Sequence, residues 1–148
     1  MSIKEDSKIE FIQGDEGAKI KQYFNPHNTQ NGINYSIVQF SLEVGGKTKL
    51  HFHNGNQVLM AVKGKGSLEI FKKYGSKKSE FKIKKMERIS LNEGDIVHIP
   101  AKTFHTHGSI DKNKEFSHVA INILPKKNAM YKTTWYESDF RSKVTKII

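Results

Sequence analysis

The chain has 148 residues, 36% of them hydrophobic, with no cysteine and a formal net charge of +10. This length is enough for one domain with a sizeable core, so we expect residues 1–148 to form a single domain. The lack of cysteine excludes disulfides and thiolate metal ligands. No apolar run approaches the length of a membrane span, and no apolar signal core follows Met1. We therefore expect a cytoplasmic protein with no membrane partner.

Much of the chain alternates between apolar and polar residues, which is the period of a half-buried β-strand. Residues 1–8 are polar and are expected to fray, and residues 38–44 alternate most clearly. Further strands are predicted, in chain order, at residues 8–12, 18–24, 50–53, 57–61, 68–71, 81–91, 96–100, 116–124 and 131–136. About ten short strands fit an all-β fold, a double-stranded β-helix or jelly-roll barrel, whose mouth can hold a ligand.

The last ten residues are predicted differently, as a short C-terminal helix. Ser138 is a residue type that caps helices well. Phe140, Val144 and Ile147 then recur at helical spacing.

Two segments together supply the ligands of a metal site. His51 and His53 are two residues apart in an extended segment, so both imidazoles leave the same face of a strand. Gln57 can join them from the next strand, and His105 comes from a segment about fifty residues later. Imidazole suits divalent transition metals, and an amide oxygen favours the harder ions among them. For Gln57, a role as a hydrogen-bond donor that supports the ligands remains the alternative.

The spacing of these residues is specific. The segments read Gly45-x5-His51-x-His53-x3-Gln57-x6-Gly64 and Gly94-x5-Pro100-x4-His105. They resemble the two motifs of the cupin family over about residues 34–136. Gln57 replaces the usual acidic ligand, and Lys102 stands where a glycine usually follows the proline. With His105-Thr-His107-Gly108 and His118, the pattern is similar to small manganese cupins that include bacterial hydroxynitrile lyases and the cupin partners of carboxymuconolactone decarboxylase-like proteins.

The resemblance implies a jelly-roll fold and one divalent metal at His51, His53, Gln57 and His105. Manganese is preferred, with iron, nickel or zinc as alternatives. His107 would share the face of His105 and is expected to be an acid/base group, a supporting partner or an occasional ligand. His118 is expected in the cavity as the second catalytic candidate.

The other two histidines are assigned no part in the chemistry. His98 is expected to be a structural histidine with its hydrogen bonds satisfied. His27 lies in a polar turn and is expected to be exposed.

Two functions fit these residues. A metal with neutral ligands acts as a Lewis acid, and a nearby histidine moves protons near neutral pH. This combination suits an enzyme acting on a small oxygenated organic molecule, either a lyase or, at manganese or iron, an oxygenase. The alternative is a non-catalytic binding or sensing cupin whose metal anchors a small ligand.

Residues 63–88 carry ten Lys or Arg against three Glu, a local excess of seven positive charges. Such a patch raises nucleic acid as a partner. The segment has little aromatic interleaving and no recognised nucleic-acid motif, so we expect a solvated lysine-rich hairpin and no specific nucleic-acid binding. Resemblance to small cupins predicts a homodimer, with Trp135 and Tyr136 as candidate anchors or as core residues.

Overall fold

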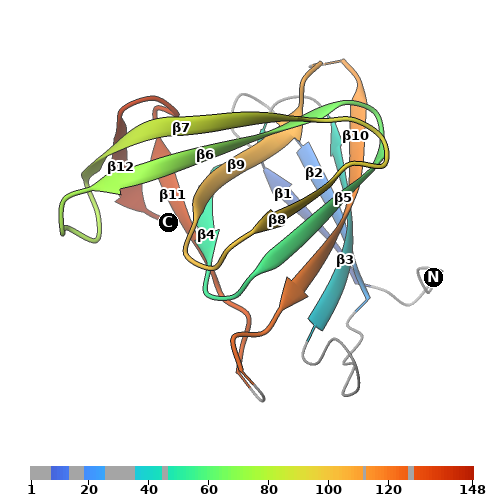
Figure 1. Ribbon diagram of the computed structural model, residues 1–148, viewed down its shortest axis with the longest axis horizontal. Coiled ribbons are helices and arrows are strands. Elements are labelled where there is room, and N and C mark those ends of the chain that lie inside the picture. Colours follow the sequence, from blue (N-terminus) through green and yellow to red (C-terminus); the bar gives the residue numbers. More distant parts are fainter. Residues whose placement is uncertain (1–7, 14–18, 26–35, 45–46, 112, 127–128) are drawn as a thin grey trace.

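The computed structural model of the protein describes residues 8–13, 19–25, 36–44, 47–111, 113–126 and 129–148. Within these ranges the chain forms β-strands and turns, without a helix (Figure 1). Accordingly, the described residues include no helix with the length and hydropathy needed to cross a membrane. The all-β prediction is confirmed.

The strands form two antiparallel sheets. The order of the first sheet is β1 (Lys8–Gln13), β2 (Lys19–Asn25), β3 (Ser36–Val44), β10 (Glu115–Ile123), β5 (Gln57–Lys63) and β8 (Ile96–Ile99). The second sheet contains β11 (Thr133–Ser138), β12 (Lys143–Ile147), β7 (Phe81–Leu91), β6 (Gly66–Tyr74), β9 (Phe104–Ser109) and β4 (Leu50–His53). This second sheet is closed, because β4 also pairs with β11. The arrangement is that of a jelly-roll barrel, as the strand pattern predicts.

The described side chains form two hydrophobic cores. The first draws on strands of both sheets and contains Leu59, Ala61, Leu68, Leu91, Ile99, Phe116 and Ala120. The second comes only from strands of the closed sheet and contains Leu50, Phe71, Phe81, Ile83, Tyr136 and Val144, with Phe52 and Phe104 packed against it. The closed sheet therefore has an apolar compartment of its own.

A β-bulge allows the long strand β7 to contribute side chains to both cores. Ile70 pairs with Glu87 and Phe71 pairs with Lys85, which leaves Met86 as the extra residue. One extra residue reverses the alternation of side chains along a strand. Phe81 therefore faces the second core, while Leu91, also at an odd-numbered position, faces the first.

The predicted C-terminal helix is wrong. Residues 139–142 form a turn in which the Asp139 carboxylate accepts hydrogen bonds from the backbone N–H groups of Arg141, Ser142 and Lys143. Strand β12 follows and pairs with β11 and β7. The β-branched residues Val144, Thr145 and Ile147 favour a strand, and burying Val144 opposite Phe81 favours it further.

Candidate metal centre

Strand β4 places two histidines on the inner side of the barrel wall. His51 and His53 are both buried, and their ring centroids are 5.0 Å apart. Leu50 and Phe52 leave the other face of the strand and contribute to the second core. The alternation predicted from the sequence is therefore present, because successive side chains of a strand point to opposite faces.

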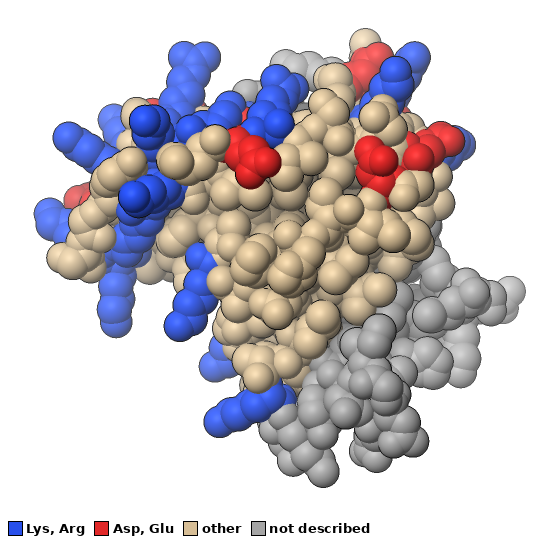
Figure 2. All heavy atoms as spheres, in the orientation of Figure 1, with Lys and Arg blue, Asp and Glu red and all other residues tan. Residues whose placement is uncertain are grey.

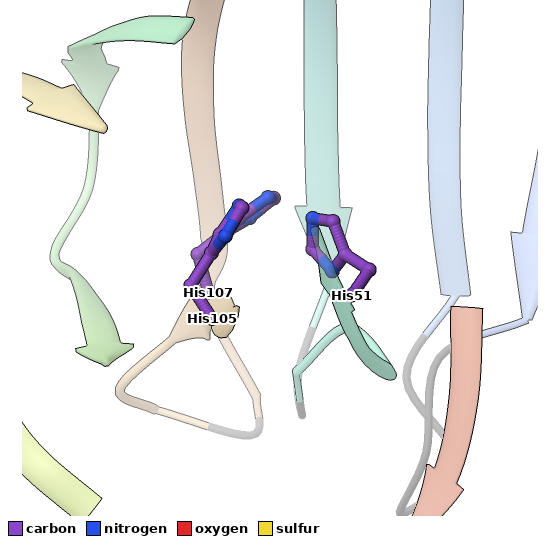
Figure 3. A group of neighbouring side chains, drawn as sticks. All are labelled: His51, His105 and His107. Carbon is purple, nitrogen blue, oxygen red and sulfur yellow. The ribbon is translucent and has the colours of Figure 1, made fainter. Parts of the chain in front are cut away.

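Strand β9 brings two more histidines to the same place. His105 lies directly opposite His51 in the β4–β9 pairing, and their ring centroids are 4.2 Å apart. Two residues on, His107 shares this face, and its ring centroid is 5.5 Å from that of His51. One ring nitrogen from each of these three histidines lies within 4.8 Å of the other two. Figure 3 shows His105 and His107 extending from one strand, where they overlap in this view, and His51 on the strand beside it.

Backbone carbonyls determine which ring nitrogen of His51 and of His105 is available to a metal. The Nδ1 atom of His51 lies 2.8 Å from the Lys49 carbonyl oxygen, and that of His105 lies 2.7 Å from the Thr103 carbonyl oxygen. A carbonyl only accepts hydrogen bonds, so Nδ1 carries the proton and Nε2 keeps its lone pair. Metal-binding histidines are held in the same way.

His53 and Gln57 add two further donor atoms. The Nδ1 atom of His53 is 2.8 Å from the Thr133 hydroxyl, and the Gln57 amide nitrogen donates to Asn122 Oδ1 at 2.8 Å. Each residue thus has one polar atom occupied and a second buried without a hydrogen bond: His53 Nε2 and Gln57 Oε1. The Nε2 atom of His105 is also buried without one. Such atoms cost about 1–3 kcal/mol each when left unsatisfied, so these residues fit a bound cation.

Burial keeps these histidines neutral, as metal binding requires. Burial, together with the charge of neighbouring histidines, holds the pKa values of His51 and His105 well below the ordinary range. Burial is also the main cause that lowers the pKa of His53 to about 4, with a contribution from His107 and an opposing one from Gln57. At neutral pH all three rings are therefore available as ligands.

Because these histidines are buried, we expect acid to destabilise the metal-free protein. Unfolded histidine takes up a proton near pH 6.5, whereas folded His53 stays neutral down to about pH 4. Between these values the unfolded state binds more protons, so the free energy of unfolding falls as the pH falls. From pH 7 to pH 5 we expect a loss of about 2 kcal/mol for each such histidine.

Urea unfolding of chelator-treated protein at the two pH values measures this loss. The variant His53→Gln should recover part of the stability lost at pH 5, whereas the exposed His98→Gln should recover none. Equal stability of the original chain at both pH values would contradict the prediction.

His107 and His118 lie next to this group. Their ring centroids are 4.9 Å apart, and His118 extends from β10 with Phe116 stacked beside it at 5.5 Å. Thr48 pairs with the backbone of His107: its hydroxyl accepts from the His107 N–H at 3.1 Å, and its own N–H donates to the His107 carbonyl at 2.8 Å. His118, Ala120 and Asn122 are all buried, as their predicted common face requires.

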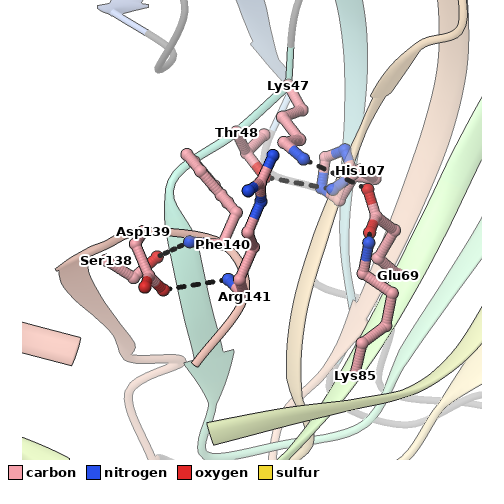
Figure 4. Close-up of polar contacts among 9 residues, drawn as sticks. All are labelled: Lys47, Thr48, Glu69, Lys85, His107, Ser138, Asp139, Phe140 and Arg141. Carbon is pink, nitrogen blue, oxygen red and sulfur yellow. Dashed lines mark hydrogen bonds and ion pairs between the residues drawn. The ribbon is translucent and has the colours of Figure 1, made fainter. Parts of the chain in front are cut away.

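An ion-pair group ties the surrounding strands together. Glu69 on β6 pairs with Lys47 and Lys85, and Lys47 also lies over the Phe140 ring at 4.4 Å (Figure 4). Burial acts to raise the pKa of Glu69, but the two lysines outweigh it and hold that pKa below its ordinary value. The group joins the start of β4 to the β6–β7 hairpin and to the C-terminal turn.

Strand β11 contributes contacts that the sequence analysis missed. Thr133 and Trp135 pair with His53 and His51 across the β4–β11 ladder. The Trp135 ring packs on His51 at 4.3 Å, and Tyr131 packs on His53 at 5.0 Å. The period-two spacing of Thr133 and Trp135 could have shown that they share a face. Tyr136 is buried in the second core, so the core alternative holds for it.

Two predicted ligand sets overlap here. The sequence prediction uses His51, His53, Gln57 and His105, whereas the tightest group of ring nitrogens contains His51, His105 and His107. Buried donor atoms without a hydrogen bond occur in both sets, so we take the first set on the spacing of its residues, which matches the two cupin motifs. Of the remaining histidines, His98 is exposed, contrary to the expected structural role, and the prediction for His27 falls outside the described residues.

The comparison with known families agrees with this fold. The family model described as Cupin matches residues 12–146. The chain belongs to the cupin family. No curated protein matches this cupin.

Solved structures share the fold of this cupin. A cupin-like protein of Thermotoga maritima is 24% identical with a TM-score of 0.55, and the match covers 86% of this chain and 88% of that one. The vicilin of Corylus avellana (hazelnut) is 17% identical with a TM-score of 0.60, over 86% of this chain and 34% of that one. Bacillus subtilis oxalate decarboxylase, described with Mn(II) centres, is 16% identical with a TM-score of 0.55, over 82% and 28%. The chain thus spans about a third of the vicilin's length.

Proposed function

We propose that this cupin is a metal-dependent enzyme acting on a small oxygenated organic molecule. One divalent transition metal would be held by His51, His53, Gln57 and His105, with His107 and His118 beside it as acid/base groups. One observation carries the proposal. Three buried donor atoms from β4, β5 and β9 lack hydrogen bonds, and they lie in a cluster of neutral histidines whose ring orientation is fixed by carbonyl and hydroxyl partners.

The ligand charges define the chemistry. All four proposed ligands are neutral, so a divalent ion would keep its full formal charge. When bound, such an ion supplies Lewis-acid chemistry and lowers the pKa of a bound hydroxyl or water. The Trp135 and Tyr131 rings, which pack on His51 and His53, restrict the movement of both side chains. Anionic and enolate-like substrate oxygens are therefore the groups that we expect this site to prefer.

We assign proton transfer to His107 and His118. Their ring centroids are 4.9 Å apart, and that of His107 is 5.5 Å from that of His51, so a substrate oxygen near the ligands would lie close to a proton carrier. In a lyase reaction at a carbinol, one histidine takes the hydroxyl proton while the bond to the leaving carbon breaks, and a proton then passes to the leaving group. Histidine is the side chain whose ordinary pKa suits this exchange at neutral pH.

The proposed subtype is the group of small manganese cupins that includes bacterial hydroxynitrile lyases. Manganese is the first ion to test, because the amide oxygen of Gln57 favours a hard ion and a manganese protein, the oxalate decarboxylase, shares the fold. Iron, nickel and zinc remain alternatives, since imidazole binds each of them. At manganese or iron, oxygenase chemistry is the competing reaction.

The enzyme proposal is tested by supplying the protein with each metal in turn and assaying two reactions. Cyanohydrins and related carbinols would be screened for release of a carbonyl product, and small enolisable compounds for oxygen consumption. We expect one of these reactions to depend on metal and to be lost in His51→Ala. Saturable binding of these compounds without turnover would replace the enzyme with a binding or sensing role.

We also expect a homodimer. In the described part of the chain, β1 and β8 are the outer strands of the first sheet, and open strand edges are usually covered. Tyr136 is buried and Trp135 stacks on His51, so we no longer expect either residue to anchor the dimer. Light scattering at micromolar concentration should give about twice the chain mass of 16.9 kDa. The monomer mass would contradict the prediction.

A further inference from the structure

A concave site lies on the far side of β4 from the histidines. It is a groove of about 450 Å³ at the second core. The residues that line it are Phe52, Lys73, Lys78, Lys102, Phe104, Thr134, Tyr136 and Ile147. Small-molecule sites are concave and mostly apolar, with a few polar groups. This groove has that composition, with aromatic rings in its wall and lysines at three positions.

The wall formed by β4 and β11 separates the groove from the metal centre. Phe52 pairs with Thr134, and both line the groove. On the same two strands, His51 and His53 pair with Trp135 and Thr133 and belong to the metal centre. Side chains alternate between the faces of a strand. A ligand in the groove is therefore distinct from one bound at the metal.

The charges of the groove are all of one sign. Its lining contains three lysines and no Asp or Glu. Lys73 lies over the Phe81 ring at 4.4 Å, while Lys78 and Lys102 are exposed and make no ion pair within the described part of the chain. Figure 2 shows lysine and arginine side chains gathered over the end of the molecule that carries the β6–β7 hairpin. The groove therefore favours an anion.

The backbone at Lys102 is an independent observation. Its φ angle is +64°, in the left-handed region that a residue with a Cβ adopts at a cost and glycine adopts freely. The strain is stabilised locally, because the Lys102 N–H donates to the His53 carbonyl at 2.7 Å. A glycine would make the same hydrogen bond with less strain. Lysine at position 102 therefore costs conformational energy that glycine would not. Its side chain extends the positive rim of the groove.

We propose that this groove is a binding site for a small organic carboxylate with an apolar body. The apolar part would lie against Phe52, Phe104 and Tyr136, and the carboxylate would lie among the ammonium groups of Lys73, Lys78 and Lys102. The groove thus gives a role to part of the lysine-rich hairpin of residues 63–88. The proposal goes beyond the metal chemistry and does not depend on it.

The test is an NMR titration of the full-length protein, supplied with Zn²⁺ as a diamagnetic ion, with hexanoate as the probe. We expect saturable shifts at Lys102, Phe104 and Ile147, with a Kd on the order of 1 mM for a ligand of this size. Hexan-1-ol has the apolar body without the charge, and acetate has the charge without the body. Hexan-1-ol should bind about two- to fivefold more weakly, which is the scale of exposed charge pairs. Acetate should also bind more weakly, because it lacks the CH₂ groups that the aromatic wall would bury.

Variants separate binding from folding. Lys102→Gly should weaken hexanoate binding about two- to fivefold while leaving the melting temperature unchanged or raised, because the strain at φ +64° is relieved. Lys78→Gln should weaken binding similarly. The matched control Lys84→Gln removes an exposed lysine outside the groove and should change nothing.

Three results would overturn the proposal: equal binding of hexanoate and hexan-1-ol, shifts confined to the metal-centre residues Gln57 and Asn122, or no shift at all. A single-stranded oligonucleotide that shifts the groove signals when hexanoate does not would also overturn it, and would assign the lysines to nucleic acid. None of these results depends on whether the metal centre is catalytic.

Discussion

Alanine in place of His51 or His105 is expected to remove the metal and the activity together. Both residues belong to each of the two overlapping ligand sets, and both present Nε2 because a backbone carbonyl holds Nδ1. Groups that only orient a metal ligand are worth about 10- to 100-fold in affinity, so removing a ligand should weaken binding by more than that. Elemental analysis of the purified variants beside the original protein measures the loss.

Two controls make this result interpretable. His98→Ala removes an exposed histidine on β8 and should keep the metal and the activity. His51→Gln fills most of the buried volume and should fold while still losing most of the affinity, which excludes general unfolding as the cause. Full metal content in both His51→Ala and His105→Ala would show that the cluster is not the metal site.

Alanine in place of His107 or His118 is expected to keep the metal and lose turnover. A general acid/base group contributes about 10²- to 10⁴-fold to rate, and these two rings lie beside the proposed ligands without being needed to complete them. Metal content and turnover should be measured side by side on both variants and on His53→Ala. Until a substrate is known, titration with a small anionic ligand can replace the turnover assay.

The same experiment decides between the two ligand sets. If His107→Ala loses the metal while His53→Ala keeps it, the ligands are the three histidines whose ring nitrogens lie within 4.8 Å of one another. If turnover or ligand binding is unchanged in both the His107 and the His118 variants, these residues serve packing and the proton-transfer part of the proposal fails.

The central residues of the site could be predicted from the sequence because strand geometry is regular. An interval of two puts His51 and His53 on one face, and the same rule puts His105 beside His107. The predicted inward face of β5 is also present, since Gln57, Leu59 and Ala61 are all buried. These relations need only the period of a strand and a correct register.

Features that depend on pairing between distant strands could not be predicted from the sequence. Phe140, Val144 and Ile147 fit a helical period, but the segment gains more by pairing β12 with β7 and burying Val144. The contacts of Thr133 and Trp135 depend on the β4–β11 register, which closes the second sheet between distant segments. The bulge at Met86 cannot be recognised from the apolar and polar residues of β7. It nevertheless determines which core each half of that strand packs against.

Elemental analysis of the protein purified from cells supplied separately with manganese, iron, nickel and zinc would show whether the histidine cluster holds a metal. We expect the protein to retain a single divalent ion per chain through gel filtration with at least one of these metals, and His51→Ala prepared in parallel to retain almost none. A protein that carries no metal under any of these supplies, or as much metal in His51→Ala as in the original chain, would contradict this expectation.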